Sequence, residues 1–441
     1  MELKQFTEHE RIGTEDVDRA FAELLQTQIR GSVLTQELRL LRMMGMDFDW
    51  RASKFVLSYY VGADWIDKKK GIAMMVRPKI KGIDFQTMFM KCFENREVSK
   101  DLDRLFFIRT EDDPIEIPAD DFQLEPLILV FFMNLVGRIV RKGLKHDYIL
   151  REERLNAQIK GKLLMSRYVK HGLAQQRSDQ TECRYQEYHV DCLENRIVKA
   201  ALLLCRMMIT RHETALGHHL LPLQQMYHNA ITAFADVSPE VTLQDLHRVH
   251  VNPVFKDYKE AMPLAKMIIR HQGHLVSNGE TGRTQMVPPF IIDMPILFER
   301  YVYCLLAERY GTRLIGYQEG CGDSIMDLTK KDERMILDTK YITSWNERTD
   351  HENARQLSGY ARRTALRKKY LLPEMDGTLC HSDDFLCPCV VIYPSSEGLT
   401  TFRDLPDHWL SDDDTPTFAA LQQVHEYQKF YKLPVKLPLT F

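Results

Sequence analysis

A short predicted strand at residues 334–342 constrains the fold of this 441-residue chain more than any other segment. Its sequence, RMILDTKYI, places Asp338 and Lys340 two residues apart, so both side chains leave the same face of the strand. The other face carries Met335, Leu337, Thr339 and Tyr341. A carboxylate and an ammonium group at one end of an otherwise apolar strand are costly to bury unless they serve a purpose. The pattern therefore indicates either a chemical site or a surface ion pair on an edge strand.

A second strand, predicted at about 324–328, would form an antiparallel hairpin with the first. Asp323 opens this strand and would lie near Asp338. Two converging carboxylates can hold a hard divalent cation such as Mg²⁺ or Mn²⁺ through oxygen ligands. The metal would polarise a phosphate oxygen and acidify water, while Lys340 would orient or activate that water and offset developing charge. The hairpin thus points to metal-assisted phosphodiester hydrolysis.

The elements around this hairpin predict a small α/β domain. A helix at 295–309 precedes the hairpin, and a helix at 352–369 and a strand at 389–393 follow it. This αββαβ order is typical of a compact α/β unit. The segment NGETGRTQMVPP is interrupted by Gly and Pro and places a domain boundary near residue 285, so the domain is expected to span 286–441.

The chain before residue 285 divides into two expected regions. Residues 1–150 mix patterns: Leu and Ile recur at helix spacing up to about residue 50, and two strands then flank a charged turn that contains Lys68, Lys69 and Lys70. Residues 151–285 are predicted to form mostly long amphipathic helices. The expected fold class is therefore α+β in several domains, with a mixed α/β N-terminal region, a helical middle and a C-terminal α/β domain.

Composition excludes several classes of protein. A net charge of −3 gives no global attraction to nucleic acid, so a DNA contact must come from a local patch. The longest apolar run, 127–136, is too short to span a membrane, and the charged N-terminus is not a secretory signal. Nine scattered cysteines indicate reduced thiols in a cytoplasmic protein. The spacing of Cys380, His381, Cys387 and Cys389 does not match a usual zinc site, and no P-loop motif occurs, so we expect no nucleotide on this chain.

The order of motifs resembles a known nuclease core. An Asp followed 15 residues later by Asp-x-Lys, a Glu in the preceding helix, and a later helix with QLSGY are similar to the PD-(D/E)xK nucleases. The segments VPPFIIDMPILFERYV, LDTKY and DHENARQLSGYA look like the C-terminal domain of the McrC family, the nuclease subunit of modification-dependent McrBC restriction systems. The resemblance extends over about residues 55–441 and leaves the first 50 or so residues unmatched.

The resemblance implies roles for individual residues. Asp323, Asp338 and Glu299 would bind the metal, Lys340 would be the catalytic lysine, and Gln356 and Tyr360 would form the signature of the downstream helix. One departure from the family pattern concerns the first aspartate. The family commonly has Arg-Pro-Asp there, whereas this chain has Cys321-Gly322-Asp323, which leaves Asp327 as the alternative ligand.

Two basic clusters are candidate contact surfaces. The first follows Tyr360 on the same predicted helix, within reach of a bound phosphate backbone, and consists of Arg362, Arg363, Arg367, Lys368 and Lys369. The second is the hairpin tip with Lys68, Lys69 and Lys70. In the McrC family the N-terminal domain docks into the pore of a hexameric AAA+ GTPase, and a charged protruding tip would suit that role. A solvated face is the alternative for each cluster.

The resemblance implies an endonuclease subunit that uses Mg²⁺ or Mn²⁺ and cuts double-stranded DNA in defence against foreign DNA. It also implies a McrB-like AAA+ GTPase hexamer as partner, and a self-dimer through the nuclease domain, because one active site cuts one strand. Two alternatives remain open at this point: a non-catalytic activator of the AAA+ motor, and a stand-alone Mg²⁺-dependent nuclease.

Overall fold

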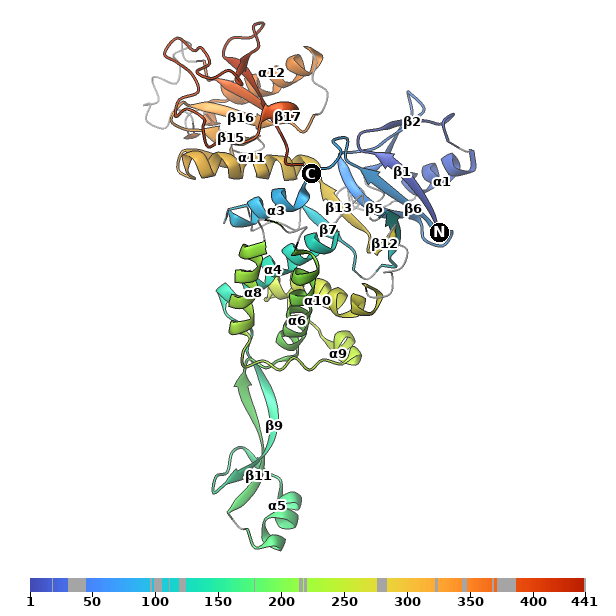
Figure 1. The fold of residues 1–441 in the computed structure, drawn as a ribbon, viewed down its shortest axis with the longest axis vertical. Helices are drawn as coiled ribbons and strands as arrows, with labels where there is room; N and C mark the ends of the chain where they lie inside the picture. The colour runs from blue at the N-terminus through green and yellow to red at the C-terminus, as the bar shows by residue number, and fades with distance from the viewer. Residues whose placement is uncertain are drawn as a thin grey trace. The chain divides into compact units, whose positions relative to one another are not determined.

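The computed structural model describes residues 1–17, 19–30, 45–95, 97–98, 105–110, 112–118, 124–177, 179–213, 217, 220–275, 284–321, 324–342, 347–366, 369–370 and 386–439. The fold is α+β with several sheets, as expected (Figure 1). Two compact units divide the chain. Unit 1 joins Met1–Asp121 to Thr284–Phe441, and unit 2 comprises Phe122–Arg283. Unit 2 is thus an insertion into unit 1. No helix among the described residues is both long and apolar enough to cross a membrane.

This division differs from the three regions expected from the sequence. The end of the middle region near residue 285 agrees with the start of the second part of unit 1 at Thr284. Its beginning does not agree, because α4 (Leu124–Lys142) was assigned to the N-terminal region but belongs to unit 2. The reason is its packing: the apolar side chains of α4 lie against other helices of unit 2.

A five-stranded sheet organises the N-terminal half of unit 1. Its strand order is β1 (Glu2–Thr7), β6 (Ile72–Arg77), β5 (Tyr60–Asp67), β13 (Phe290–Asp293) and β7 (Phe106–Ile108). The β5–β6 hairpin confirms the strands predicted around the charged turn. The chain contributes β13 only after returning from unit 2, so the sheet contains residues from before and after the unit 2 insertion.

The expectation of a helical N-terminus was only partly right. α1 (Arg19–Arg30) is helical and buries Phe21, Leu25 and Ile29 in the core beside the sheet. The strands β1, β2 (Arg11–Gly13) and β3 (Asp47–Asp49) flank it, with β4 (Lys54–Val56) between β2 and β3. Residues 31–44 lie outside the described residues. The N-terminal strand β1 pairs in parallel with β6, a contact between segments about 70 residues apart that local periodicity does not reveal.

Two more elements complete this half of unit 1. α3 (Phe85–Glu94) follows the β5–β6 hairpin, and Asp84 caps it by accepting a hydrogen bond from the Thr87 amide. The strands β7 and β8 (Ile115–Pro118) follow it, and β8 pairs with β12 (Thr284–Val287).

A six-stranded sheet forms the C-terminal half of unit 1. Its order is β14 (Ile315–Cys321), β15 (Ser324–Lys330), β16 (Met335–Thr339), β17 (Cys389–Leu399), β19 (Phe430–Val435) and β18 (Gln422–Gln423). In Figure 1, β15, β16 and β17 lie between α11 (Met294–Tyr310) and α12 (Glu347–Arg362). The predicted αββαβ elements are therefore present. β14, β18 and β19 were not predicted, because β14 is polar with two glycines and β19 contains a proline.

Unit 2 is a helical bundle that carries a long β-ribbon. Besides α4, its helices are α6 (Leu193–Arg211), α8 (Leu220–Ala233), α9 (Leu243–Arg248) and α10 (Lys256–Leu275), as expected for this stretch. The segment between α4 and α6 contradicts the helical expectation. It forms the antiparallel ribbon of β9 (Asp147–Asn156) and β11 (Gln180–His189), with β10 (Lys162–Leu163) and the short helix α5 (Met165–His171) at its far end.

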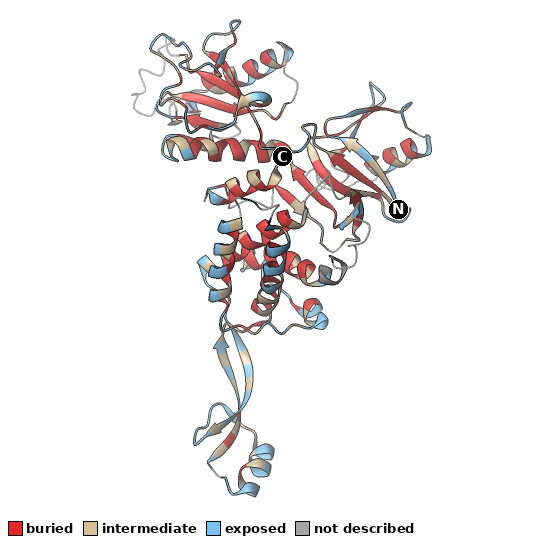
Figure 2. Cartoon of the chain, viewed as in Figure 1, coloured by how far each residue is buried: buried red, intermediate tan, exposed pale blue. Residues whose placement is uncertain are grey.

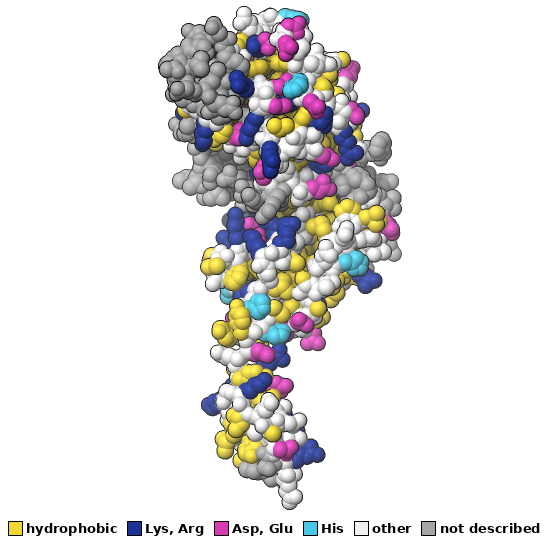
Figure 3. Space-filling view, turned by 90° about the vertical axis from the view of Figure 1, so that its left-hand side faces the viewer, with side chains coloured by type: hydrophobic (Ala, Val, Ile, Leu, Met, Phe, Trp, Pro, Cys, Tyr) yellow, Lys and Arg dark blue, Asp and Glu magenta, His cyan; other side chains and the backbone are white. Residues whose placement is uncertain are grey.

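Cross-strand charge pairs explain why this charged segment forms a ribbon. Glu152 lies opposite Arg184, with 2.5 Å between carboxylate and guanidinium, and Arg154 lies opposite Glu182 at 3.1 Å. Opposite charges on facing positions stabilise paired strands. The ribbon is exposed over much of its length (Figure 2). Apolar side chains gather at its far end in Figure 3, where Ile159 is 67% exposed.

A buried hydrogen bond joins the two halves of unit 1. The Oε1 atom of Glu8 accepts hydrogen bonds from the Tyr341 hydroxyl at 2.8 Å and from the Lys79 amide at 2.9 Å. Tyr341 follows directly after Lys340 and also makes ring contacts with Tyr59 and Phe298. Burial raises the pKa of Glu8 to about 7, even though both hydrogen bonds oppose the shift.

We predict that Glu8→Gln removes part of the pH dependence of stability. Because the pKa of Glu8 is raised from 4.5 to about 7 in the folded protein, its contribution to stability is present below pH 4.5 and is lost as the pH rises through 7. The loss is at most about 3 kcal/mol. Glutamine keeps the acceptor oxygen but does not titrate, so the variant should gain stability relative to wild type between pH 5 and 8. Thermal unfolding across this range checks it, and parallel curves for the two proteins would contradict it.

Candidate active site

The strands β15 and β16 separate beside a pair of aspartates. Leu328 pairs with Leu337, and the next positions in this register are Asp327 and Asp338. No ladder pair forms there among the described residues. Instead, the Oδ2 atom of Asp327 accepts hydrogen bonds from the Thr339 amide at 2.9 Å and from the Thr339 hydroxyl at 3.0 Å. The carboxylate of Asp327 thereby takes the place of a ladder carbonyl and lies beside Asp338.

Glu299 adds a third carboxylate from α11. Asp293 caps the start of this helix by accepting a hydrogen bond from the Ile296 amide, and Pro295 follows in the first turn, where a missing N–H costs little. The Oε1 atom of Glu299 accepts a hydrogen bond from Gln318 Nε2 at 3.0 Å. Burial and the neighbouring charge of Asp327 raise the pKa of Glu299 to about 7, and Asp338 adds to the shift.

Lys340 supplies a positive charge to this carboxylate group. Asp338 is 1% exposed, and its Oδ2 atom lies 2.9 Å from Lys340 Nζ. Burial and Asp327 raise the pKa of Asp338 to about 6, against the opposing effect of Lys340. Burial opposes the charged form of Lys340, but the charges of Asp338 and Asp327 outweigh it and raise the pKa of the ammonium group.

This arrangement fits a divalent cation. Burial and the nearby charge of Asp327 raise the pKa of both Glu299 and Asp338, and a divalent cation beside these carboxylates would relieve the repulsion among them. The Oδ1 atom of Asp338 is buried and accepts no hydrogen bond from the described residues. A buried, unpartnered carboxylate oxygen costs free energy that a bound cation would recover. The residues that would hold it are Asp327, Asp338 and Glu299.

The structure brings together most of the predicted catalytic residues. Glu299, Asp338 and Lys340 interact as described, and α12 carries Gln356 and Tyr360, whose side chains are joined by a 3.3 Å hydrogen bond. Tyr360 is close enough to Lys340 to affect the pKa of its ammonium group. Asp323 lies outside the described residues, so its predicted role stays a prediction.

The predicted basic helix is not continuous. α12 ends at Arg362, and the three-residue helix α13 (Thr364–Leu366) follows after a break, so the five basic residues do not share one helix. Arg363 donates a hydrogen bond to the Ser324 hydroxyl, and Lys369 lies over the ring of Tyr370. Arg367 and Lys368 lie outside the described residues.

The three lysines at the β5–β6 turn differ in their surroundings. Lys68 pairs with Asp112 at 3.2 Å and Asp113 at 3.1 Å, and these partners raise the pKa of its ammonium group. The ammonium group is therefore held against the β7–β8 segment. Lys69 and Lys70 are exposed, and both donate their amides to Asp67, as a tight turn requires.

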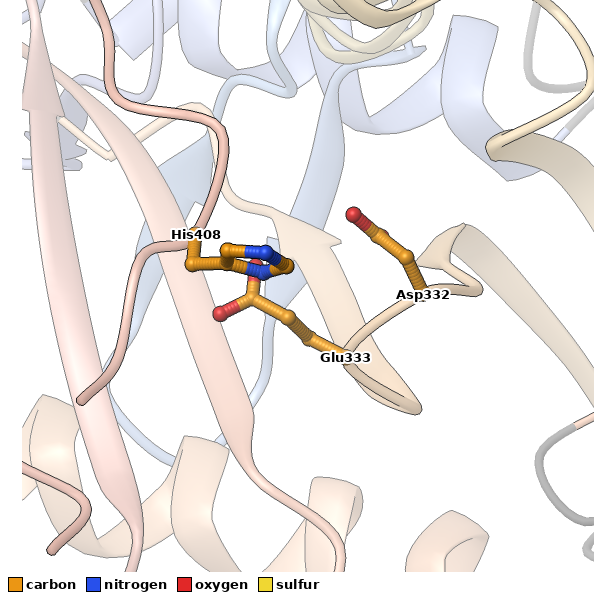
Figure 4. A group of neighbouring side chains, drawn as sticks. All are labelled: Asp332, Glu333 and His408. Atoms are coloured by element: carbon orange, nitrogen blue, oxygen red, sulfur yellow. The ribbon is translucent and has the colours of Figure 1, made fainter. Parts of the chain in front are cut away.

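A second group of possible metal ligands lies at the β15–β16 turn. Figure 4 shows Asp332, Glu333 and His408 close together. Part of their negative charge is already offset, because the fully buried Lys330 places its Nζ atom 2.6 Å from each of the two carboxylates. Glu333 also accepts hydrogen bonds from the Trp409 and Leu410 amides. This group is accounted for as a structural ion-pair network.

The cysteine group discounted at the sequence level is described only in part. Cys387 and Cys389 are buried, and Cys387 donates a hydrogen bond to the Arg334 carbonyl at 2.8 Å. Cys380 and His381 lie outside the described residues. Sequence reasoning missed Gln318 entirely, because β14 was not predicted and nothing in its sequence distinguishes this glutamine.

Comparison with known proteins gives a family and two solved structures. Residues 57–372 match the family described as McrBC 5-methylcytosine restriction system component. One structure, from Thermococcus gammatolerans, is a refined half-complex from a tetradecameric assembly of McrB AAA+ hexamers with bound McrC. It is 18% identical, with 98% of this chain and 94% of that chain covered and a TM-score of 0.39. A second, the Thermococcus gammatolerans McrBC complex, is 18% identical over 70% and 88% of the two chains, with a TM-score of 0.30. No curated protein matches.

We predict that Mn²⁺ raises the unfolding temperature of the isolated chain through the carboxylates around Asp338. At ten times its dissociation constant, the ion would stabilise the folded state by about 1.4 kcal/mol. Asp338→Asn should remove most of this shift, because it removes a buried ligand. It should also raise the unfolding temperature without metal at pH 8, because it relieves repulsion among like charges.

His408→Ala is the matched control for this measurement. It removes a possible ligand from the second group, and the Mn²⁺ shift should stay unchanged, because Lys330 and two backbone amides already bind the carboxylates of that group. If the Mn²⁺-induced shift were lost in His408→Ala and kept in Asp338→Asn, the ion would bind at Asp332, Glu333 and His408, and the prediction would be wrong.

Proposed function

Because the chain belongs to the McrBC family of 5-methylcytosine restriction system components, we propose that it is the DNA endonuclease subunit of such a system. The observation that carries the proposal is the convergence of Glu299, Asp327 and Asp338 beside Lys340. Converging carboxylates, with a lysine two residues after one of them, suit metal-assisted hydrolysis of a phosphodiester.

In this proposal Asp327, not Asp323, is the first acidic ligand. Asp327 interacts with both other carboxylates, and its position is set by two hydrogen bonds from Thr339. It uses Oδ2 for both bonds, which leaves Oδ1 for a cation. The departure from the family pattern at residues 321–323 is consistent with this assignment, because Asp327, four residues after Asp323, supplies the negative charge that the cation requires.

Each residue of the site has a separate task. A bound Mg²⁺ or Mn²⁺ would supply a Lewis acid and acidify a water molecule. Asp327, Asp338 and Glu299 hold the cation and set its position. Lys340 keeps its proton beside Asp338 and offers positive charge where negative charge develops on the phosphate. Tyr360 and Gln356, joined on α12, border the site and can orient the backbone of the DNA.

The proposed partner is a McrB-like AAA+ GTPase hexamer that this chain binds and stimulates. The two Thermococcus gammatolerans structures are described as McrB AAA+ hexamers with bound McrC and as a McrBC complex. Membership of the McrBC family supports the same kind of partner for this chain. Double-stranded DNA would be cut by two copies of the nuclease domain, since one site cleaves one strand. Arg362 and the exposed Lys369 are available to contact its phosphates.

We predict that plasmid cleavage with Mg²⁺ requires the AAA+ partner and its nucleotide, and that it is lost in Asp338→Ala. Asp327→Asn should reduce the rate by roughly 100-fold or more, because it removes charge at the reacting centre. Asp323→Asn is the matched control and should cut within a few-fold of wild type.

If instead Asp323→Asn lost cleavage and Asp327→Asn kept it, Asp323 would be the metal ligand and the proposed site would be wrong. A chain that raises hydrolysis by the partner while neither wild type nor variants cut DNA would be a non-catalytic activator. Cleavage by the purified chain without the partner would instead indicate a stand-alone nuclease.

A further inference from the structure

Gln318 has an unusual backbone conformation for its position. Its φ angle is +46°, in the left-handed region. The other non-glycine residues with positive φ in the described part of the chain lie in turns or bends, whereas Gln318 lies inside the strand β14. A left-handed conformation costs a residue with a Cβ atom roughly 1–2 kcal/mol. Such strain inside a regular element calls for a local reason.

The reason lies in how β14 contacts α11. The ring of Tyr317 contacts the ring of Tyr303 in a tilted arrangement with 4.6 Å between ring centroids, so its side chain faces α11. In a regular strand the next side chain leaves the opposite face. Gln318 nevertheless reaches the same helix, because its Nε2 atom donates a hydrogen bond to Glu299 at 3.0 Å. Two successive side chains on one face require a break in the pleat, and the positive φ provides it.

The two α11 residues that β14 contacts, Glu299 and Tyr303, lie on the same face of the helix. Glu299 and Tyr303 are four residues apart, so they lie one above the other on the same face of the helix. Gln318 also occupies the position opposite Asp327, because Tyr317 pairs with Leu328 and Glu319 pairs with Met326 on either side of it. Gln318 thus lies between the helix and the strand that supply two of the three carboxylates.

We propose that Gln318 is a positioning residue for Glu299, and that its strained backbone exists to hold one oxygen of that carboxylate. This inference rests on the proposed function, because it concerns the same site. A neutral amide donor orients Oε1 without cancelling the negative charge, whereas a lysine or arginine there would compete with a cation. The second oxygen of Glu299 would then be left for the cation.

The variant Gln318→Gly separates positioning from stability. Glycine adopts positive φ without strain, so the free chain should unfold at an equal or higher temperature than wild type. Gln318 is exposed, so its removal opens no cavity in the core. Glu299 loses its hydrogen bond, and we expect the Mn²⁺ concentration that gives half the unfolding-temperature shift to rise by roughly 10-fold. DNA cleavage with the AAA+ partner should need correspondingly more Mg²⁺.

Arg334→Gly is the matched control. Arg334 has a φ of +53° in the turn between β15 and β16, so glycine relieves comparable strain in the same sheet. Its Mn²⁺ dependence should equal that of wild type. A purely structural role for Gln318 would make both variants behave alike, with higher stability and unchanged metal dependence, and that result would overturn the inference while leaving the nuclease in place. A wild-type chain that neither responds to Mn²⁺ nor cuts DNA with its partner would instead overturn the proposed function and this inference with it.

Discussion

The C-terminal half of unit 1 is organised around three carboxylates that lie close together in a largely buried site. Glu299, Asp327 and Asp338 come from one helix and two strands, and burial together with the charge of Asp327 raises the pKa of both Glu299 and Asp338. A fold selected only for stability would not assemble them. One lysine offsets part of the repulsion, and two hydrogen bonds from Thr339 hold Asp327 in place. The strands separate at this point, so the ladder is incomplete where the chemistry is proposed.

The two halves of unit 1 are connected through the elements that carry this site. The strand β13 pairs on both sides within the N-terminal sheet and leads directly into α11, the helix of Glu299. A second connection joins Glu8, just beyond β1, to Tyr341, the residue after Lys340. Both contacts link the N-terminal sheet to the ends of elements that carry the proposed site. A change in the N-terminal sheet therefore has a short structural route to the helix and the strand of the site.

Sequence patterns identified the central strand but not its surroundings. The alternation in RMILDTKYI was sufficient to predict β16 with Asp338 and Lys340 on one face, because a strand has a period of two wherever it occurs. The choice between Asp323 and Asp327 depended on the register of β15, which is set by pairing with β14 and β16 on both sides. The ribbon of β9 and β11 was misjudged as helix for a related reason. Its charges lie at spacings that suit either structure, and only pairing across the two strands places Glu152 opposite Arg184.

The sequence by itself determined the family, the α+β class and the identity of Glu299, Asp338, Lys340, Gln356 and Tyr360 as candidates, because these depend on residue types at short, regular spacings. Only the tertiary structure decided which carboxylates meet, that α4 belongs with unit 2, and that the chain returns from unit 2 to complete the N-terminal sheet with β13. It also revealed Gln318, whose proposed role depends on its backbone angle and on its hydrogen bond to Glu299, 19 residues earlier in the chain. These features are long-range contacts, and their energies depend on packing partners that no local window of sequence contains.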